Sequence, residues 1–364
     1  MVLFASMFGL VAALVLSGVV YQCLGERSDR RRYTREGRWI DIGDKRRLYL
    51  LEMGSGDATV LFEAGIAATN LNWFHIQATV SRFASTASYD RCGLGWSSPS
   101  RTARTPTNIA TELHQLLAGA GIKPPYILVG HSFGGLVMRR FALNYPEEVS
   151  SIVLVDPMRC EEWPPMNPGK QAEIDRGKKL FRFAIPIARV GLARLAVTSL
   201  FLRSGVAAQR LAGAAGDGGT HVLDRVKNEV GKMPREVWPI IAAHWSRPNN
   251  FAGMRSHVEA VPDTVREMQN AGPILKIPVL VLTPEKSTPL SDDCLAQIGC
   301  RVRQVIAPKS AHWIHLDQPD LVIRYGRWWW PPPQRRWPWL TETVGRRDYA
   351  RVLSRSTFSL RLQR

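Results

Sequence analysis

Residues 126–136 read Tyr-Ile-Leu-Val-Gly-His-Ser-Phe-Gly-Gly-Leu, and this stretch decides the fold. An apolar, β-prone run leads directly into Gly-x-Ser-x-Gly, which is followed by residues that open a helix. A sharp turn from strand to helix strains the central residue and projects its side chain beyond the sheet. Gly130 and Gly134 are needed because a Cβ at either position would collide with the neighbouring strand or helix. The context predicts that Ser132 is a nucleophile, although the same letters also occur by chance in loops.

The sequence on both sides of this stretch alternates between strand and helix patterns. Alternation of this kind predicts a mostly parallel sheet with helices on both faces. We expect further strands at residues 39–41, 46–51, 58–62, 85–89, 151–156, 277–282 and 302–306, and helices at residues 70–82, 107–120 and 136–145.

The alternation stops between residues 158 and 273, where the sequence is helical in character and broken by Pro and Gly. An insertion of this size after a central strand is expected to form a cap over the carboxyl ends of the strands, where ligands bind. The core domain then consists of residues 38–157 and 274–323. Within the cap, residues 180–202 are apolar with interspersed arginines, which fits either a pair of lid helices or a surface that rests on a bilayer.

The amino terminus has the properties of a membrane segment. Residues 2–24 carry no formal charge, and at about 1.5 Å per residue they can cross a hydrocarbon core of about 30 Å. Five arginines follow in residues 25–37, which we expect to be a basic juxtamembrane linker. We predict that residues 1–24 are an uncleaved single-pass anchor, with the following domain on the cytoplasmic side. A cleaved signal peptide is the alternative, but this segment lacks a basic start and is longer than usual.

The formal net charge of +17 is concentrated near the two ends of the chain. Residues 324–364 contain ten arginines and two acidic residues, and residues 25–50 contain nine basic and five acidic residues. The body is therefore only mildly basic, and we expect no nucleic-acid partner. The five cysteines form neither a CxxC pair nor a metal-ligand spacing, so no metal or cofactor is expected.

The segment 324–364 is rich in Arg, Trp and Pro, and five of the chain's twelve Trp residues lie in it. Tryptophan and arginine together suit a membrane interface, so a second bilayer contact is one hypothesis. A disordered extension is the other, and we expect the segment to be disordered.

A serine hydroxyl needs a base to remove its proton. Of the eight histidines, only His312 follows the last predicted strand and precedes the final helix. Its loop returns to the sheet edge that carries Ser132, so we predict His312 as the base. We expect His131, next to Ser132 in sequence, to line the elbow, and His315 to pack one turn later.

Four stretches occur in the order found in the α/β-hydrolase superfamily, which the chain resembles over residues 38–323. They are Glu-Ala-Gly at 63–65, Tyr-Asp-Arg-Cys-Gly-Leu-Gly-Trp-Ser at 89–97, the Gly-rich elbow at 130–135, and Ser-Ala-His-Trp-Ile-His-Leu-Asp-Gln-Pro at 310–319. The resemblance is to the serine esterase and lipase-like branch with a helical cap. It implies an α/β-hydrolase fold in which Ser132 is the nucleophile and His312 the general base and then acid. It also implies an oxyanion hole made by the backbone N–H groups of Phe133 and Ile66.

The acid of the catalytic triad is where the sequence departs from the family pattern. A carboxylate is usual near position 287, where this chain has Ser287. Glu285 lies close by, at an earlier position of the same turn. The family also uses a position directly after the strand that follows the nucleophile helix, and Asp156 occupies it. We predict Asp156 as the acid and keep Glu285 as the alternative. Asp156 could instead cap the turn before Pro157.

The resemblance and the serine nucleophile together imply cleavage of an ester, thioester or amide through an acyl-enzyme. Related dehalogenases and epoxide hydrolases use Asp at the position of Ser132, so those activities are disfavoured. The apolar cap and the predicted anchor favour a hydrophobic small molecule or a lipid as the substrate. Two rival hypotheses are a catalytically silent binding or scaffold protein with this fold and a carbon–carbon bond hydrolase. The sequence predicts no oligomeric state.

Overall fold

The computed structural model describes residues 2–160, 168–202 and 229–328. The chain divides into two compact units, residues 1–329 and 330–364. The second unit lies outside the described residues, and so do two segments of the predicted cap and most of the predicted tail.

Eight strands form one sheet in the described part of the chain, in the order β1-β2-β4-β3-β5-β6-β7-β8. β1 and β2 form an antiparallel hairpin, and β2 is antiparallel to β4, whereas every pairing from β4 to β8 is parallel. The predicted α/β architecture is confirmed. The strands are β1 (Arg38–Asp41), β2 (Arg47–Met53), β3 (Thr59–Glu63), β4 (Ser85–Tyr89), β5 (Tyr126–His131), β6 (Val149–Val155), β7 (Val279–Pro284) and β8 (Val302–Ala307).

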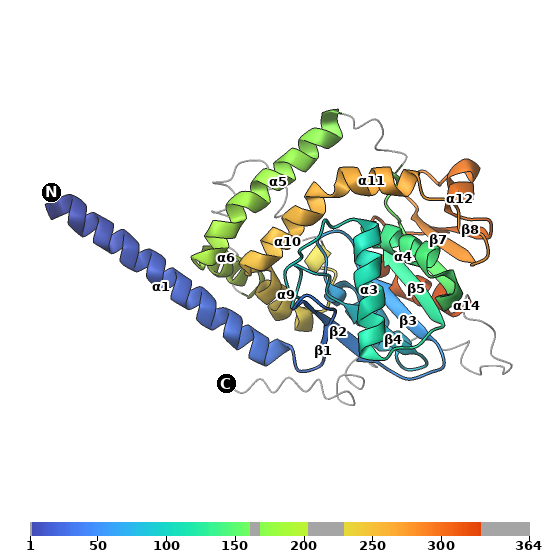
Figure 1. Cartoon of the computed structure of the whole chain (residues 1–364), viewed down its shortest axis with the longest axis horizontal. Helices are drawn as coiled ribbons and strands as arrows, with labels where there is room; N and C mark the ends of the chain where they lie inside the picture. The colour runs from blue at the N-terminus through green and yellow to red at the C-terminus, as the bar shows by residue number, and fades with distance from the viewer. Residues whose placement is uncertain (1, 161–167, 203–228, 329–364) are drawn as a thin grey trace. The chain divides into compact units, whose positions relative to one another are not determined.

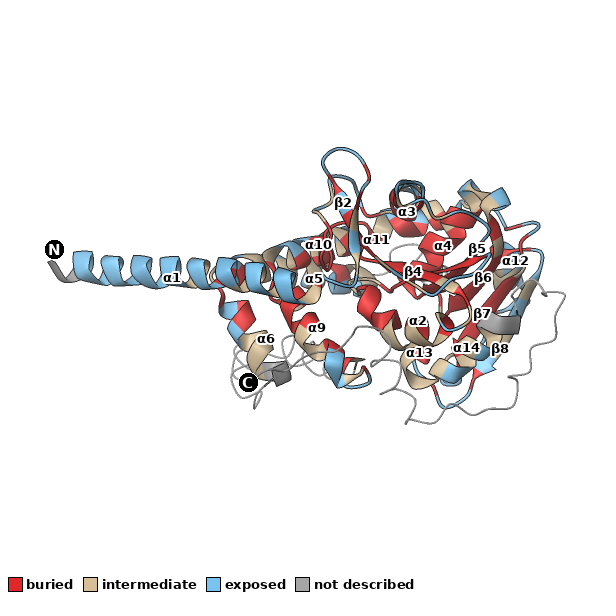
Figure 2. Cartoon of the chain, turned by 90° about the horizontal axis from the view of Figure 1, so that it is seen from below, coloured by how far each residue is buried: buried red, intermediate tan, exposed pale blue. Residues whose placement is uncertain are grey.

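Helices cover both faces of the sheet, as expected for strands that are buried on two sides (Figure 1, Figure 2). One face carries α3 (Pro106–Ala120), α4 (Phe133–Asn144) and α12 (Asp292–Ile298). The other carries α2 (Phe74–Val80), α13 (Ile314–Asp317) and α14 (Pro319–Trp328), with the 3₁₀ helix η1 (Asn70–Trp73) leading into α2.

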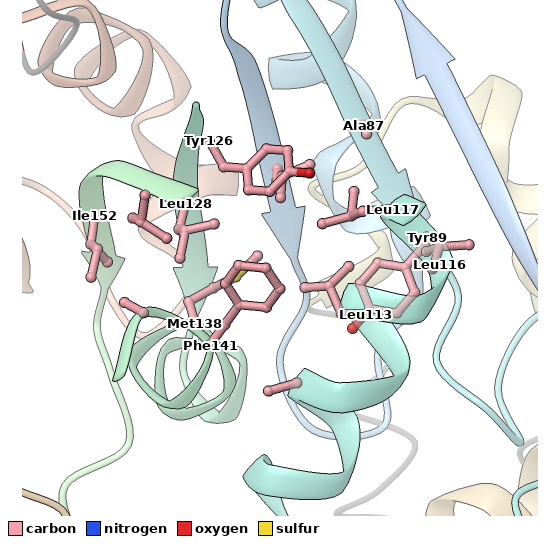
Figure 3. Close-up of a cluster of buried hydrophobic side chains, with 14 of the residues drawn as sticks. Ala87, Tyr89, Leu113, Leu116, Leu117, Tyr126, Leu128, Met138, Phe141 and Ile152 are labelled. Atoms are coloured by element: carbon pink, nitrogen blue, oxygen red, sulfur yellow. The ribbon is translucent and has the colours of Figure 1, made fainter. Parts of the chain in front are cut away.

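The core on the α3 and α4 side packs against one face of β5. Tyr126 and Leu128 of β5 point toward Leu116 on α3 and Phe141 on α4 (Figure 3). All four side chains are at most 2% exposed. Because alternate residues of a strand face opposite sides, this packing fixes the register of β5. It thereby fixes the point at which residue 132 leaves the sheet.

The cap consists of the helices between β6 and β7. Those that the structure describes are α5 (Pro168–Arg189), α6 (Leu192–Leu202), η4 (Arg235–Val237), α9 (Trp238–Trp245), α10 (Pro248–Glu259) and α11 (Val261–Gln269). A buried apolar cluster joins η4 and α9 to the core domain, through Tyr49 of β2, Leu71 of η1 and Trp96 of the turn after β4.

The amino-terminal helix α1 (Val2–Tyr33) is docked on the cap by the half that is closer to the core. At Gly18 a Cβ would lie 2.3 Å from the Val190 carbonyl oxygen, so only glycine permits this approach. Asp29 accepts a hydrogen bond of 2.6 Å from the Arg194 guanidinium of α6. The other half of α1 is exposed (Figure 2).

Several boundaries differ from those expected from the sequence, and three of them affect the site or the limits of the domains. α1 continues through much of the predicted linker, to Tyr33, because Arg and Glu have high helix propensity and can extend a helix that has already formed. α4 begins at Phe133 and not at residue 136, so that Ser132 is the residue directly before the helix. α14 extends to Trp328, so the predicted tail boundary at residue 324 falls inside this helix.

Candidate active site

Ser132 occupies the sharp turn between β5 and α4, with φ 52° and ψ −121°. A positive φ is costly for a residue with a Cβ and is tolerated only where the surroundings enforce it. The close backbone packing at the two flanking glycines holds Ser132 in this conformation. A Cβ on Gly130 would lie 2.6 Å from the Gly134 carbonyl oxygen, and one on Gly134 would lie 2.4 Å from the Ala64 carbonyl oxygen. The strand and the helix can therefore approach closely enough to form the strained turn.

Asp156 and His312 form a direct hydrogen bond. Asp156 follows β6 immediately and also has a positive φ, of 43°, while its N–H donates to the Leu282 carbonyl oxygen of β7 at 2.8 Å. His312 lies in the loop between β8 and α13. Its Nδ1 is 2.7 Å from Asp156 Oδ2, and the Asp156 side chain is 14% exposed. A proton on Nδ1 would donate to the carboxylate and leave Nε2 as the acceptor.

Glu285, the alternative acid, is held elsewhere. It is exposed in the turn after β7, where its N–H donates to the Ala307 carbonyl oxygen at 3.1 Å. Its Oε2 accepts a hydrogen bond of 2.8 Å from the N–H of Lys309, a residue with positive φ. The structure therefore brings Asp156, and not Glu285, to the imidazole of His312.

The loop that carries Ile66 passes directly beside the turn at Ser132. A Cβ on Gly65 would lie 2.9 Å from His131 Nδ1 and 3.6 Å from Ser132 Cβ. Phe133 is the first residue of α4, so its N–H has no acceptor within the helix and lies at the positive end of the helix dipole. The two segments that carry the predicted oxyanion donors thus both adjoin Ser132.

A buried ionic cluster supports the Ile66 loop, and sequence reasoning did not identify it. Arg91 pairs with Glu63 at 3.2 Å, and both side chains are 1% exposed. The guanidinium also donates to the carbonyl oxygens of Ala64 and Gly65, and the Tyr89 hydroxyl donates to Glu63. Burial raises the pKa of the Glu63 carboxyl, while the Arg91 charge opposes this change. The only signal in the sequence was position, because Glu63 directly follows the expected strand 58–62 and Arg91 lies two residues after the expected strand 85–89.

Two further histidines, His131 and His315, lie close to His312. His131 donates from Nε2 to the His312 carbonyl oxygen at 2.9 Å, and its ring centroid lies 4.7 Å from that of His312 and 4.3 Å from that of His315. Burial lowers the pKa of His131 well below its usual value and lowers the pKa of His315 to about 3. Both rings are therefore neutral at pH 7 and do not oppose a positive charge on His312.

A cavity of about 260 Å³ lies beside the first turns of α4. Its lining is mainly apolar and includes Leu136, Met158 and Met268, together with Arg139 and Cys160. Met158 donates its N–H to the Ser132 carbonyl oxygen at 3.1 Å, so the cavity adjoins the turn. Ser132 and His312 are not among its lining residues.

Two other features bear on the sequence predictions. Among the described residues, no group of three or more His, Cys, Asp or Glu side chains is arranged to hold a metal ion. In the same part of the chain one helix, spanning Phe4–Tyr33, is long and apolar enough to cross a membrane, with a mean hydropathy of 2.1 over an 18-residue window. A signal sequence near the amino terminus would meet the same criterion.

The chain matches a family model described as the alpha/beta hydrolase fold over residues 58–183. This range includes Ser132 and Asp156, whereas His312 lies beyond it. The uncharacterized protein YqjL of Bacillus subtilis is 36% identical over 104 residues, which cover 29% of this chain and 41% of that protein. The putative carbamate hydrolase RutD of Escherichia coli is 34% identical over 99 residues, which cover 27% and 35%. The chain thus spans less than half the length of the curated relatives it matches.

Solved structures resemble the chain over a longer range but with lower sequence identity. The epoxide hydrolase CorEH, determined without ligand, has a TM-score of 0.60 and 16% identity, with 80% of this chain and 97% of that chain covered. Identity at this level shows a shared fold and nothing about the reaction.

Proposed function

Because this chain is a member of the α/β-hydrolase superfamily, we propose that it is a serine hydrolase. Its substrate would be an ester, or a thioester or amide, of a hydrophobic small molecule or lipid. The observation that carries this proposal is the hydrogen bond between His312 Nδ1 and Asp156 Oδ2, formed at the sheet edge where the turn presents Ser132. Serine, histidine and a carboxylate in these roles are the constellation that activates a serine hydroxyl.

In the proposed reaction, His312 Nε2 accepts the proton of Ser132 Oγ as this oxygen attacks the substrate carbonyl carbon. The N–H groups of Phe133 and Ile66 donate to the oxyanion, and Asp156 stabilises the protonated imidazole. His312 then gives its proton to the departing alcohol, thiol or amine, which leaves an acyl group on Ser132. A water molecule gives a proton to His312 and attacks the acyl carbon, and His312 then returns this proton to Ser132 Oγ as the carboxylic acid leaves.

The buried ionic cluster of Glu63, Arg91 and Tyr89 serves this reaction through the backbone. Two carbonyl groups next to Ile66 accept hydrogen bonds from Arg91, so the loop is held before substrate binds. Donors that are fixed in advance stabilise an oxyanion without a further cost of reorganisation.

Of the two rivals, a catalytically silent binding protein was suggested by the absence of a carboxylate near residue 287. The carboxylate of Asp156 beside His312 supports an enzyme instead. A carbon–carbon bond hydrolase could use the same three residues, and only substrate assays separate it from an esterase.

We further propose that α1 is an uncleaved membrane anchor, with the folded domain on the cytoplasmic side. The support is its exposed apolar half together with the arginines that follow it. Intact-mass measurement of the protein from membranes tests the anchor, since a cleaved signal peptide would remove α1. Protease protection in sealed vesicles tests the orientation.

The reaction is tested by labelling the full-length protein with a fluorophosphonate, which reacts covalently with an activated serine. We expect labelling of the wild type and of Ser287→Ala, a serine outside the proposed triad, but none of Ser132→Ala or His312→Ala. Hydrolysis of p-nitrophenyl esters should depend on the same residues, with kcat/KM rising as the acyl chain lengthens. Labelling that is independent of Ser132 would overturn the proposal.

A further inference from the structure

The corner between α5 and α6 exposes large apolar side chains to an unusual degree. Phe183, Ile187, Leu192 and Leu195 are 60%, 43%, 48% and 53% exposed. Among the described residues outside α1, only Leu275 and Ile306 are also exposed hydrophobic side chains of this size. Scattered single cases are normal on a protein surface, whereas four within thirteen residues form a patch that has to be explained.

The patch lies directly beside the proposed anchor. Val190 and Gly191, at the turn between the two cap helices, contact α1. A Cβ on Gly191 would lie 2.8 Å from a ring carbon of Tyr21, and a Cβ on Gly18 would lie 2.3 Å from the Val190 carbonyl oxygen. The apolar surface of the corner is therefore continuous with the apolar surface of α1.

The position of this contact along α1 sets the depth of the patch. The uncharged segment ends at Leu24, and Glu26 is the first charged residue after it. Gly18 lies six residues earlier, which is about 9 Å along a helix. If α1 crosses the bilayer, the α5–α6 corner lies at the boundary between headgroups and acyl chains. Interfacial helices insert their apolar side chains to a depth of about 5–10 Å at this boundary.

The charges around the patch also suit a lipid surface. From Arg176 to Arg194 the chain has six basic residues and no acidic one. Arg182 and Arg189 are exposed next to the patch, and the guanidinium of Arg182 lies 5.5 Å from the ring centroid of Phe183. Arg194 is instead buried and paired with Asp29 of α1, so its charge is neutralised within the contact.

From these observations we propose that the α5–α6 corner is a second membrane contact, which rests on the phospholipid bilayer beside α1 and brings the cap to the lipid phase. This inference depends on the proposed anchor and deepens the proposed function, because it assigns the source of the substrate. The ester would enter the cap from the bilayer and not from the aqueous phase.

The contact is tested with the full-length protein in vesicles of phosphatidylcholine and phosphatidylglycerol that contain a phosphatidylcholine with a diazirine on its acyl chain. After illumination, we expect lipid adducts on peptides from α1 and on peptides that cover residues 182–195, but none on peptides that contain Leu275 or Ile306. Adducts on α1 without adducts on residues 182–195 would overturn the inference. No adducts on α1 would overturn the anchor. This readout requires no enzyme activity, so it holds whether or not an ester is cleaved.

A second experiment uses a variant with Phe183→Ser, Ile187→Ser, Leu192→Ser and Leu195→Ser, and a control with Leu275→Ser and Ile306→Ser. Replacing four apolar side chains at an interface should weaken the contact by at least about tenfold. We therefore expect hydrolysis of a long-chain ester held in vesicles to fall about tenfold in the patch variant, with no change for soluble p-nitrophenyl acetate. The control should change neither rate. An equal loss on both substrates would show that the patch supports the fold of the cap and would overturn the inference.

Discussion

Replacing Asp156 by Asn isolates the part of the proposed triad that the sequence left open. The side chain keeps its shape but loses its charge, and its amide would donate toward His312 Nδ1. The imidazole proton would then move to Nε2, where it blocks acceptance of the serine proton.

The size of the effect follows from the geometry. The two groups are in direct contact at 2.7 Å, so their charges are centred about 4 Å apart, which corresponds to about 4 kcal/mol at an effective dielectric constant of about 20. His312 is 39% exposed, so solvent screening reduces this to about 3 kcal/mol. That loss alone lowers the rate about 150-fold. The wrong tautomer lowers it further, toward the factor of about 10⁴ known for this substitution in a serine protease.

The assay is kcat for p-nitrophenyl ester hydrolysis by the full-length protein, with Glu285→Gln as the matched control. The same chemical change at Glu285 removes an exposed charge and leaves an oxygen that can still accept from the Lys309 N–H, so we expect less than about a twofold change in kcat. Thermal unfolding of both variants checks that they are folded. A similar loss in both variants, or Asp156→Asn activity above about a tenth of wild type, would refute the assignment of the acid.

Three other predictions follow from the same site and the cap. Gly65→Ala should lower kcat more than about tenfold, because the added Cβ would lie 2.9 Å from His131 Nδ1 and displace the oxyanion loop; an unchanged kcat would count against that role. His131→Phe should lower kcat about fivefold by removing a hydrogen bond of about 1 kcal/mol to the His312 loop, and His131→Gln, which keeps a donor, should recover most of it. Burial lowers the pKa of His244 to about 3, so its contribution to stability is complete above pH 6.5 and is lost as the pH falls toward 3. Below about pH 6, the free energy of unfolding should therefore fall with decreasing pH more steeply for the wild type than for His244→Phe, by about 1.4 kcal/mol per pH unit. Chemical unfolding measures both slopes, and equal slopes would contradict a buried neutral ring.

The sequence predicted the features that depend on local pattern. Short apolar runs bounded by turn residues located the strands. Gly130 and Gly134 marked the turn, because their role is steric and does not depend on distant residues. His312 could be predicted from chain order, since the loop after the last strand must return to the same sheet edge. The choice between Asp156 and Glu285 could not be settled in this way. It depends on the direction of each carboxylate, which tertiary contacts set.

Other features depend on contacts between residues that are far apart in the sequence. The pairing of Arg91 with Glu63, and its bonds to the backbone beside Ile66, join segments whose proximity comes from the sheet order. The contact of His131 with His312 spans 181 positions. The docking of α1 on the cap was also not anticipated, because residues 25–37 were expected to be a linker. A charged segment after an apolar one does not reveal that Asp29 has a partner in α6.

That docking makes the amino-terminal helix an integral part of the folded domain and not an exchangeable tether. The guanidinium of Arg194 is buried between Asp29 and the side-chain oxygen of Gln22, and both partners belong to α1. Without this helix the guanidinium would lose its counterion, and breaking a buried ion pair commonly costs about 3–5 kcal/mol. A foreign transmembrane segment could hold the protein at a membrane, but it would supply neither Asp29 nor the close approach at Gly18. Natural variation in this helix should therefore be constrained along the face that bears Gly18, Gln22 and Asp29, and free on the opposite face.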